Sequence, residues 1–113
     1  MSDCLFCKIV NKDIPSKKVY EDEGILAFYD IAPAAPVHIL VLPKEHIASL
    51  AEATDEQLAL IGRIHGVMRD LAVELGLQEG YRVVNNCGDA GGQTIPHLHF
   101  HLLGGRNLSW PPG

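Results

Sequence analysis

The sequence has no long apolar run, few aromatic residues and no excess of positive charge. None of its 113 residues belongs to a stretch near the ~18–20 apolar residues that cross a bilayer. Met1-Ser2-Asp3 lacks the basic region that opens a signal peptide. We therefore expect no membrane partner and a cytoplasmic location. The net charge of −5 argues against binding a nucleic-acid polymer, which needs a basic surface, but still allows a mononucleotide ligand.

Cysteine is also scarce. Three cysteines in a cytoplasmic chain do not make a disulfide framework. Cys4 and Cys7 form a Cys-x-x-Cys pair, which by itself fits half of a zinc site, a redox pair or two small core residues. Cys87 stands apart from this pair, and we assign it no role.

Chain length and apolar periodicity predict one α+β domain over residues 1–113. Thr54 and Gln57 form a capping-box pattern, and a long helix is expected from there to about Leu75, with Gly76 as its stop. A short helical turn and five strands complete the prediction, the turn at 3–10 and the strands at 17–20, 25–29, 38–42, 81–86 and 97–103. Short links between the strands indicate an antiparallel sheet with the long helix on one face.

Three histidines alternate with apolar residues in the run His97-Leu98-His99-Phe100-His101. In a strand such alternation places the histidines on one face and the apolar residues on the other, against the helix. The exposed imidazoles fit two chemistries: metal ligation, or nucleophilic and proton-transfer catalysis. The preceding Asn86 and the segment Gly91-Gly92-Gln93-Thr94 supply flexible backbone, amides and a hydroxyl, which suit phosphate oxygens and favour the catalytic interpretation.

The run His97-Leu98-His99-Phe100-His101-Leu102-Leu103 resembles the His-x-His-x-His-x-x signature of the histidine triad (HIT) superfamily of nucleotidyl hydrolases and transferases. Other segments resemble the Hint branch of that superfamily and extend the likeness over nearly the whole chain: Phe28-Tyr29-Asp30-Ile31, Pro36-Val37-His38, Pro43-Lys44-Glu45-His46-Ile47, Gly91-Gly92-Gln93, Gly104-Gly105-Arg106 and Trp110-Pro111-Pro112-Gly113. The resemblance implies a HIT-like fold with the predicted five-stranded sheet.

The resemblance also implies an activity: hydrolysis of purine nucleoside 5′-phosphoramidates, of the AMP-amine or AMP-lysine type, through a covalent nucleotidyl-histidine. His99 would be the nucleophile, with its other ring nitrogen donating to the carbonyl of His97. His101 and Thr94 would bind phosphoryl oxygens and protonate the amine, and His38 would support the triad.

The implied nucleotide-binding set is Asp30 for the ribose hydroxyls, Ile31 for the purine, and Asn86, Gly92, Gln93 and Phe6. From the residues alone, Asp30 is more simply a turn residue and His38 a buried, hydrogen-bonded histidine. Two other functions remain open: a dinucleoside polyphosphate hydrolase, and a zinc-bearing nucleotide-binding regulatory module with weak catalysis. The Gly-Gly-Gln loop and the Trp-Pro-Pro-Gly ending favour the phosphoramidase over the first of these.

A metal site and a homodimer are also expected. Zinc-bearing relatives imply a structural zinc on Cys4, Cys7, His46 and His97, a tetrahedral Cys₂His₂ set. A homodimer across the long helix and the strand at 81–86 is expected as well. Gly62 and Gly66 would allow close helix approach, and the tail with Trp110 would complete the partner's site.

Overall fold

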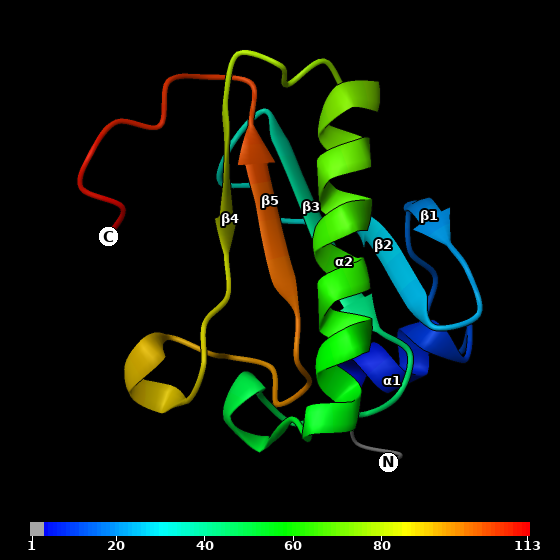
Figure 1. The fold of residues 1–113 in the computed structure, drawn as a ribbon. Coiled ribbons are helices and arrows are strands. Elements are labelled where there is room, and N and C mark those ends of the chain that lie inside the picture. Colours follow the sequence, from blue (N-terminus) through cyan, green and yellow to red (C-terminus); the bar gives the residue numbers. More distant parts are fainter. Residues whose placement is uncertain (1–3) are drawn as a thin grey trace.

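The computed structural model describes residues 4–113, so the first residue of the predicted turn at 3–10 lies outside the described residues. The helices are α1 (Leu5–Val10) and α2 (Asp55–Glu74), and the strands are β1 (Lys18–Glu21), β2 (Ile25–Tyr29), β3 (Val37–Pro43), β4 (Tyr81–Val84) and β5 (Phe100–Gly104). All strand pairs are antiparallel, in the order β1-β2-β3-β5-β4. The predicted α+β fold, with its five-stranded sheet and long helix, is confirmed (Figure 1).

The long helix α2 begins and ends as the sequence indicates. The Thr54 hydroxyl accepts from the Gln57 N–H, and the Gln57 side chain accepts from the Thr54 N–H, which closes the capping box. Gly76, just past the helix, has φ +76°, a conformation that favours glycine. Leu58 in the first turn of this helix is half exposed, although it is apolar.

Each face of the sheet carries its own apolar cluster. Leu98, Phe100 and Leu102 pack in the cluster that includes the buried side of α2, as predicted. The other face packs against α1, with Phe6 in contact with Phe28. Strand β3 lies in the middle of the sheet and is buried along nearly its whole length. The histidine run therefore enters the sheet between two packed layers, beside its central strand.

The histidine run is less regular than predicted, because β5 begins at Phe100 and not at residue 97. The preceding residues bond outside the strand ladder: the Leu98 N–H donates to Ile47 O (2.6 Å) and the His97 N–H to Ile95 O (2.8 Å). Strand β4 likewise ends at Val84 instead of residue 86. Only His101 of the three histidines lies within the strand, and the other two belong to the segment that leads into it.

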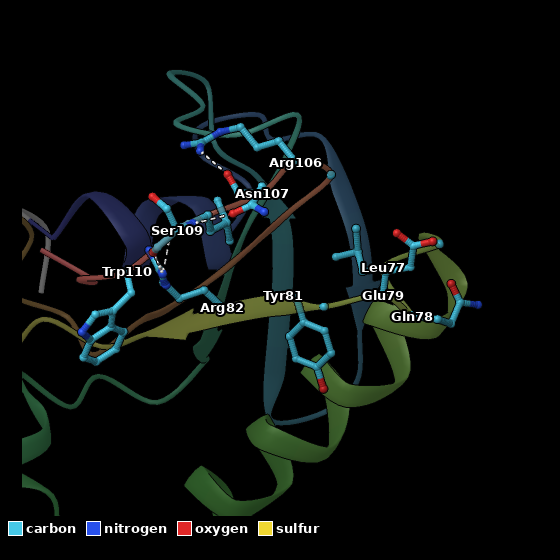
Figure 2. A pocket seen from close by; sticks show the side chains of 13 residues that line it. Leu77, Gln78, Glu79, Tyr81, Arg82, Arg106, Asn107, Ser109 and Trp110 are labelled. Atoms are coloured by element: carbon cyan, nitrogen blue, oxygen red, sulfur yellow. Dashed lines mark hydrogen bonds between the residues drawn. The ribbon is translucent and has the colours of Figure 1, made fainter.

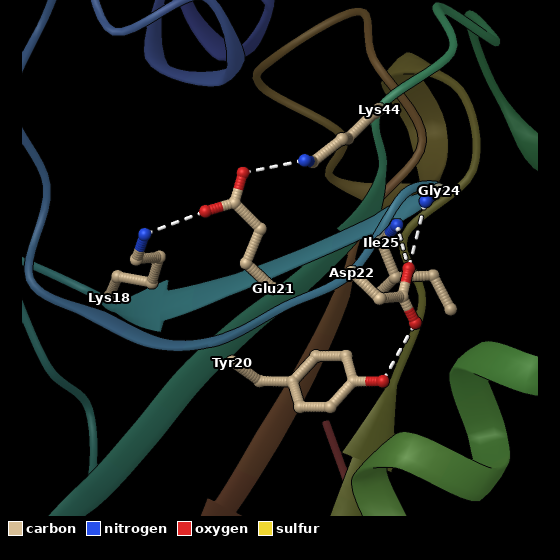
Figure 3. Close-up of polar contacts among 7 residues, drawn as sticks. All are labelled: Lys18, Tyr20, Glu21, Asp22, Gly24, Ile25 and Lys44. Carbon is tan, nitrogen blue, oxygen red and sulfur yellow. Dashed lines mark hydrogen bonds and ion pairs between the residues drawn. The ribbon is translucent and has the colours of Figure 1, made fainter.

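Two carboxylates anchor the β1–β2 turn (Figure 3). Asp22 accepts hydrogen bonds from the N–H groups of Gly24 and Ile25, each at 2.8 Å, and from the Tyr20 hydroxyl at 2.7 Å. Glu21 pairs with Lys18 and with Lys44, the residue that follows β3. These contacts fix the end of β3, and the carbonyl of Pro43 at that end contacts the histidine run.

Candidate active site and metal centre

His99 is buried and has a defined tautomer. Its Nδ1–H donates to the carbonyl oxygen of His97 at 2.7 Å, so the hydrogen of the neutral ring is on Nδ1 and Nε2 keeps a free lone pair. The ring of Phe6 contacts it edge-on, with centroids 4.9 Å apart. Burial lowers the pKa of His99, while the His97 carbonyl opposes that shift. The neutral ring presents a nucleophilic nitrogen near pH 7.

His38 and His101 form a directed pair beside His99. The Ala34 N–H donates to His38 Nδ1 at 3.0 Å, so the hydrogen of a neutral His38 must be on Nε2. His38 Nε2 lies 2.9 Å from His101 Nδ1, so its N–H donates and His101 Nδ1 accepts. A neutral His101 then carries its hydrogen on Nε2, an atom that is buried and has no hydrogen-bond partner among residues 4–113. The pair thus holds a donor ready for a ligand.

Burial, together with the neighbouring rings of His99 and His38, lowers the pKa of His101 to about 4. Burial also lowers the pKa of His38. Both rings are therefore neutral near pH 7 in the absence of a bound anionic ligand, and the two hydrogen bonds described above are mutually consistent.

Asp30 lies at the end of β2, next to this pair. Its Oδ1 accepts from the Ala32 N–H at 2.8 Å, as expected of a turn residue. Its Oδ2 lies 3.4 Å from His38 Nε2. The next residue, Ile31, has a fully exposed side chain, unusual for a large aliphatic residue and suited to contact with an aromatic base.

The loop before the histidines contains the predicted phosphate-binding residues. Thr94 is exposed, and Gly92 has φ +87°, with its Cβ position 4.0 Å from Asn86 Cγ. The Gln93 side chain is occupied by backbone: its Nε2 donates to Ala48 O and Ile95 O, and its Oε1 accepts from the Gly88 N–H. Gln93 therefore shapes the loop, and its direct contact with substrate stays a prediction.

The four residues of the predicted metal set lie together, with one ligand atom of each within 4.8 Å of the others. His97 Nδ1 is 3.3 Å from Cys4 Sγ and 3.6 Å from Cys7 Sγ, and His46 Nδ1 is 3.3 Å from Cys7 Sγ. Ligands on a tetrahedral ion at 2.1–2.3 Å are separated by roughly 3.5–3.8 Å, so the spacing is close to that of a metal site.

The hydrogen bonds of His97 favour ligation. Its Nε2–H donates to Pro43 O at 2.8 Å, which fixes the hydrogen on Nε2 and leaves the Nδ1 lone pair directed at the two thiols. Burial raises the pKa of the Cys7 thiol to about 11, helped by the hydrogen bond and charge of Cys4. A cation at this position would lower that pKa and stabilise the thiolate. This cluster can therefore hold a metal ion.

Sequence reasoning missed one side chain in direct contact with the site. Asn85 follows β4, and its Nδ2 donates to the carbonyl oxygen of His99 at 2.9 Å. Only the neighbouring Asn86 was singled out from the sequence. The pattern offered one signal, a second amide directly after an apolar strand that ends close to the histidines.

The C-terminal tail borders a hollow of about 900 Å³ at the far end of the sheet, lined by the α2–β4 loop and residues 105–110. Arg82 on β4 holds the tail by donating from Nη2 to Leu108 O and Ser109 O (Figure 2). Trp110 has 82% of its surface exposed, and Figure 2 shows its ring directed away from Tyr81. The tail thus presents a large aromatic surface that is mostly exposed.

Comparison with known proteins gives the same family from sequence and from structure. A family model described as "Scavenger mRNA decapping enzyme C-term binding" matches residues 3–109. An "uncharacterized HIT-like protein" of Synechococcus elongatus is 58% identical over 98% of this chain and 97% of its own. A "14 kDa zinc-binding protein" of Zea mays is 48% identical over 99% of this chain and 89% of its own.

A crystal structure of a HIT family hydrolase from Legionella pneumophila superposes with a TM-score of 0.96, at 48% identity, and covers 98% of this chain and 100% of that one. The match therefore covers nearly the whole chain. This chain belongs to the histidine triad superfamily.

Proposed function

We propose that this protein hydrolyses purine nucleoside 5′-phosphoramidates through a nucleotidyl intermediate on His99. The observation that carries the proposal is the hydrogen bond from His99 Nδ1–H to the His97 carbonyl, which leaves Nε2 as a neutral nucleophile. Membership of a superfamily that includes hydrolases supports the reaction class. The phosphoramidate substrate is our inference from the sequence resemblance.

The proposed reaction has two displacements at the α-phosphorus. In the first, the His99 Nε2 lone pair forms a bond to phosphorus, and the P–N bond breaks with its electron pair on the amine nitrogen. That nitrogen takes a proton from His101 and leaves as a neutral amine. In the second, water attacks the phosphorus, the Nε2–P bond breaks with its electron pair on His99, and the water proton passes to His101.

His101 must be protonated for the first step, although its pKa is about 4 without ligand. The anionic phosphate of a bound nucleotide raises this pKa by offering an opposite charge at close range. A protonated His101 carries hydrogen on both nitrogens, so its Nδ1 can no longer accept from His38 Nε2–H, which then needs another acceptor. Asp30 Oδ2, 3.4 Å from His38 Nε2, is the acceptor within reach. In this proposal Thr94, Asn86 and Gly92 bind the phosphate, and Ile31, Asp30 and Phe6 border the nucleoside.

The proposal includes a structural zinc on Cys4, Cys7, His46 and His97. Two thiols and two ring nitrogens form the softer donor set that zinc prefers, and no carboxylate belongs to it. When bound, the ion would hold α1 and the 43–47 segment to the histidine run. His97 would keep its carbonyl directed at His99, and the zinc would take no part in the reaction. A reducing compartment such as the cytoplasm, which we propose as the location, keeps both cysteines as thiols. Separately, no helix among the described residues has the length and apolar character of a membrane span.

The proposal also includes a homodimer across α2 and β4. A Cβ at Gly62 or Gly66 would meet nothing within 4 Å, and the exposed Tyr81 and Val83 lie on the edge strand β4. We expect sedimentation to give a dimer at micromolar concentration. Deletion of residues 108–113 should leave the dimer intact and change the preference among amine leaving groups. If the full-length protein is a monomer, the proposal that the tail with Trp110 completes the partner's site is wrong.

Single-turnover experiments test the function. The protein is mixed with an AMP-lysine conjugate, its GMP counterpart or a diadenosine polyphosphate, quenched in base and digested for mass spectrometry. We expect a nucleotidyl adduct on His99 that forms faster from the phosphoramidates. Faster formation from the dinucleotide would favour a polyphosphate hydrolase. Tight AMP binding with no adduct from any substrate would favour a regulatory binding module.

A further inference from the structure

The loop between β2 and β3, residues 31–36, contains the backbone group that sets the tautomer of His38. The Ala34 N–H donates to His38 Nδ1 at 3.0 Å, and the ring hydrogen is therefore on Nε2, which faces His101. Most of this loop is exposed, and two of its residues are prolines, which have no N–H to donate. The position of the Ala34 N–H therefore depends on contacts that other segments make with the loop.

The segment that follows β5 makes such contacts. Strand β5 ends at Gly104, opposite Val37 at the start of β3, so the residues after β5 lie beside the loop. A Cβ at Gly105 would lie 2.9 Å from Pro36 Cβ, and Gly105 has φ +92°, so this close approach requires glycine. The backbone after β5 is thereby packed against the last residue of the loop.

The next residue, Arg106, holds the loop by a hydrogen bond. Its Nη2 donates to the carbonyl oxygen of Ala34 at 3.0 Å, and its Nη1 donates to Asn107 O at 3.1 Å (Figure 2). Among the side chains of residues 4–113 that lie outside 30–38, Arg106 alone hydrogen-bonds to the loop. The carbonyl that it holds and the N–H that orients His38 flank the same Cα. A fixed carbonyl therefore restricts the rotations that would move this N–H away from the ring.

We propose that Arg106 is a positioning residue for the His38–His101 pair, which it serves by holding the Ala34 carbonyl. The inference rests on the proposed function, in which this pair delivers the proton to the amine. The hydrogen bonds of Arg106 go to two backbone carbonyls, so it acts through the Ala34 peptide and then through His38.

Loss of the Arg106 bond changes the hydrogen position on His38. The Ala34 N–H is then free to leave His38 Nδ1, and the ring hydrogen can move to that nitrogen. His38 Nε2 no longer donates to His101 Nδ1 in this tautomer, so His101 loses the contact that orients it and that keeps its own hydrogen on Nε2.

The test compares Arg106→Met with Arg69→Met in the full chain. Methionine keeps an apolar stem and removes the guanidinium. Arg69 offers a matched control, because it is also an exposed arginine, and its Nε pairs with Asp70 on α2. Three quantities are measured: the tautomer of the His38 ring by long-range ¹H–¹⁵N NMR near pH 7, kcat and KM for the AMP-lysine conjugate, and the melting temperature. Two further variants are Arg106→Lys, which restores one donor, and Arg106→Met combined with His38→Ala.

For Arg106→Met we expect a mixture of His38 tautomers in place of hydrogen on Nε2 alone. The kcat should fall by about threefold to tenfold and KM should stay within about twofold, because the lost bond is exposed and its acceptor is neutral. Arg106→Lys should recover part of both losses, and Arg69→Met should leave the tautomer and kcat unchanged. In the His38→Ala background, Arg106→Met should cause no further fall in kcat, because the ring through which it acts is absent.

Hydrogen on His38 Nε2 alone in Arg106→Met, or a wild-type kcat in that variant, would overturn the proposal. An equal fall in kcat in the His38→Ala background would also overturn it, because the arginine would then act on the site by another route. If the wild type forms no nucleotidyl adduct, the proposed function fails, and the His38 tautomer still decides whether Arg106 orients the ring.

Discussion

Two histidine clusters flank His99, and by proximity alone both look like metal sites. One contains Cys4, Cys7, His46 and His97, and the other Asp30, His38 and His101; in each, the candidate ligand atoms lie within 4.8 Å of one another. Their hydrogen bonds separate them. In the first cluster Pro43 O accepts the His97 hydrogen on Nε2, which frees Nδ1 for a metal. In the second, the Ala34 N–H occupies His38 Nδ1 and forces the hydrogen onto Nε2, the atom that faces His101 and Asp30.

The difference lies in the backbone groups around the rings. When one ring nitrogen of a neutral histidine donates to a backbone carbonyl, the other nitrogen has a free lone pair and can bind a metal. When one ring nitrogen accepts from a backbone N–H, the other nitrogen carries the hydrogen and can donate it. Two histidines of one short run, His97 and His101, are thereby assigned to different chemistries. The shared neighbour is His99, whose own hydrogen is fixed by the His97 carbonyl.

The largest expected effect comes from removing that shared neighbour. His99→Ala should lower kcat for the AMP-lysine conjugate by more than about a thousandfold, because no other group replaces the nucleophile. AMP binding, measured by calorimetry, should persist. His65→Ala is the control, since His65 lies on α2 and bonds to Ile61 O. Near-normal turnover in His99→Ala would contradict the assignment.

Breaking the His38–His101 pair should have a smaller effect. His38→Ala removes the donor that orients His101, and we expect kcat to fall by about a hundredfold, within the range of general acid–base effects. Its metal content, measured by elemental analysis, should equal that of the wild type, because the polar partners of His38 are Ala34, His101 and Asp30, which lie outside the Cys4, Cys7, His46 and His97 cluster. Loss of metal in His38→Ala would show that the two clusters are not separate.

Substitution of the two cysteines should affect the metal cluster and leave the His38–His101 pair in place. Cys4→Ser with Cys7→Ser should abolish zinc binding and lower the melting temperature, while kcat falls by less than about tenfold. Serine keeps a hydrogen-bond acceptor at position 4, where Cys4 caps α1 and accepts from the Cys7 N–H, so the metal effect is isolated from the cap. An unchanged melting temperature in zinc-free protein would exclude a structural metal.

The smallest expected effect is the pH dependence of stability between pH 5 and 6.5. The folded state lowers the pKa values of His38, His99 and His101 below the ordinary 6.5, so the unfolded chain binds more protons in this range. Stability should be complete above about pH 6.5 and fall as the pH drops toward 5. The loss should total roughly 1–2 kcal/mol after allowance for solvent screening. Urea unfolding of metal-loaded protein measures this slope, and His101→Gln should reduce it; an equal slope in both would contradict the account.

Periodicity was sufficient to predict most of the fold. The capping box at Thr54 and Gln57, the helix stop at Gly76 and the apolar face of Leu98, Phe100 and Leu102 are local patterns, and the structure confirms them. The start of β5 was predicted three residues early, because the alternation at 97–99 looks like a strand. Whether those residues join the ladder depends on the 43–47 segment, which binds them instead and lies some fifty residues away.

The candidate site was predictable as a set of residues but not as a set of tautomers. Motifs indicate which histidines gather, and the Cys₂His₂ set lies together as the resemblance implied. The proton positions depend on the backbone groups of Ala34 and Pro43, which no side-chain pattern reveals. The bond from Asn85 to His99 O was missed for the same reason, since a backbone acceptor leaves no mark on the sequence.

The most direct test of the central claim is a long-range ¹H–¹⁵N NMR spectrum of the histidine side chains in the ligand-free, zinc-loaded protein near pH 7. We expect hydrogen on Nε2 for His97, His38 and His101, and on Nδ1 for His99. We also expect a metal-shifted Nδ1 signal for His97 alone among these four. Hydrogen on Nδ1 of His38, or on Nε2 of His99, would contradict the division between the two clusters.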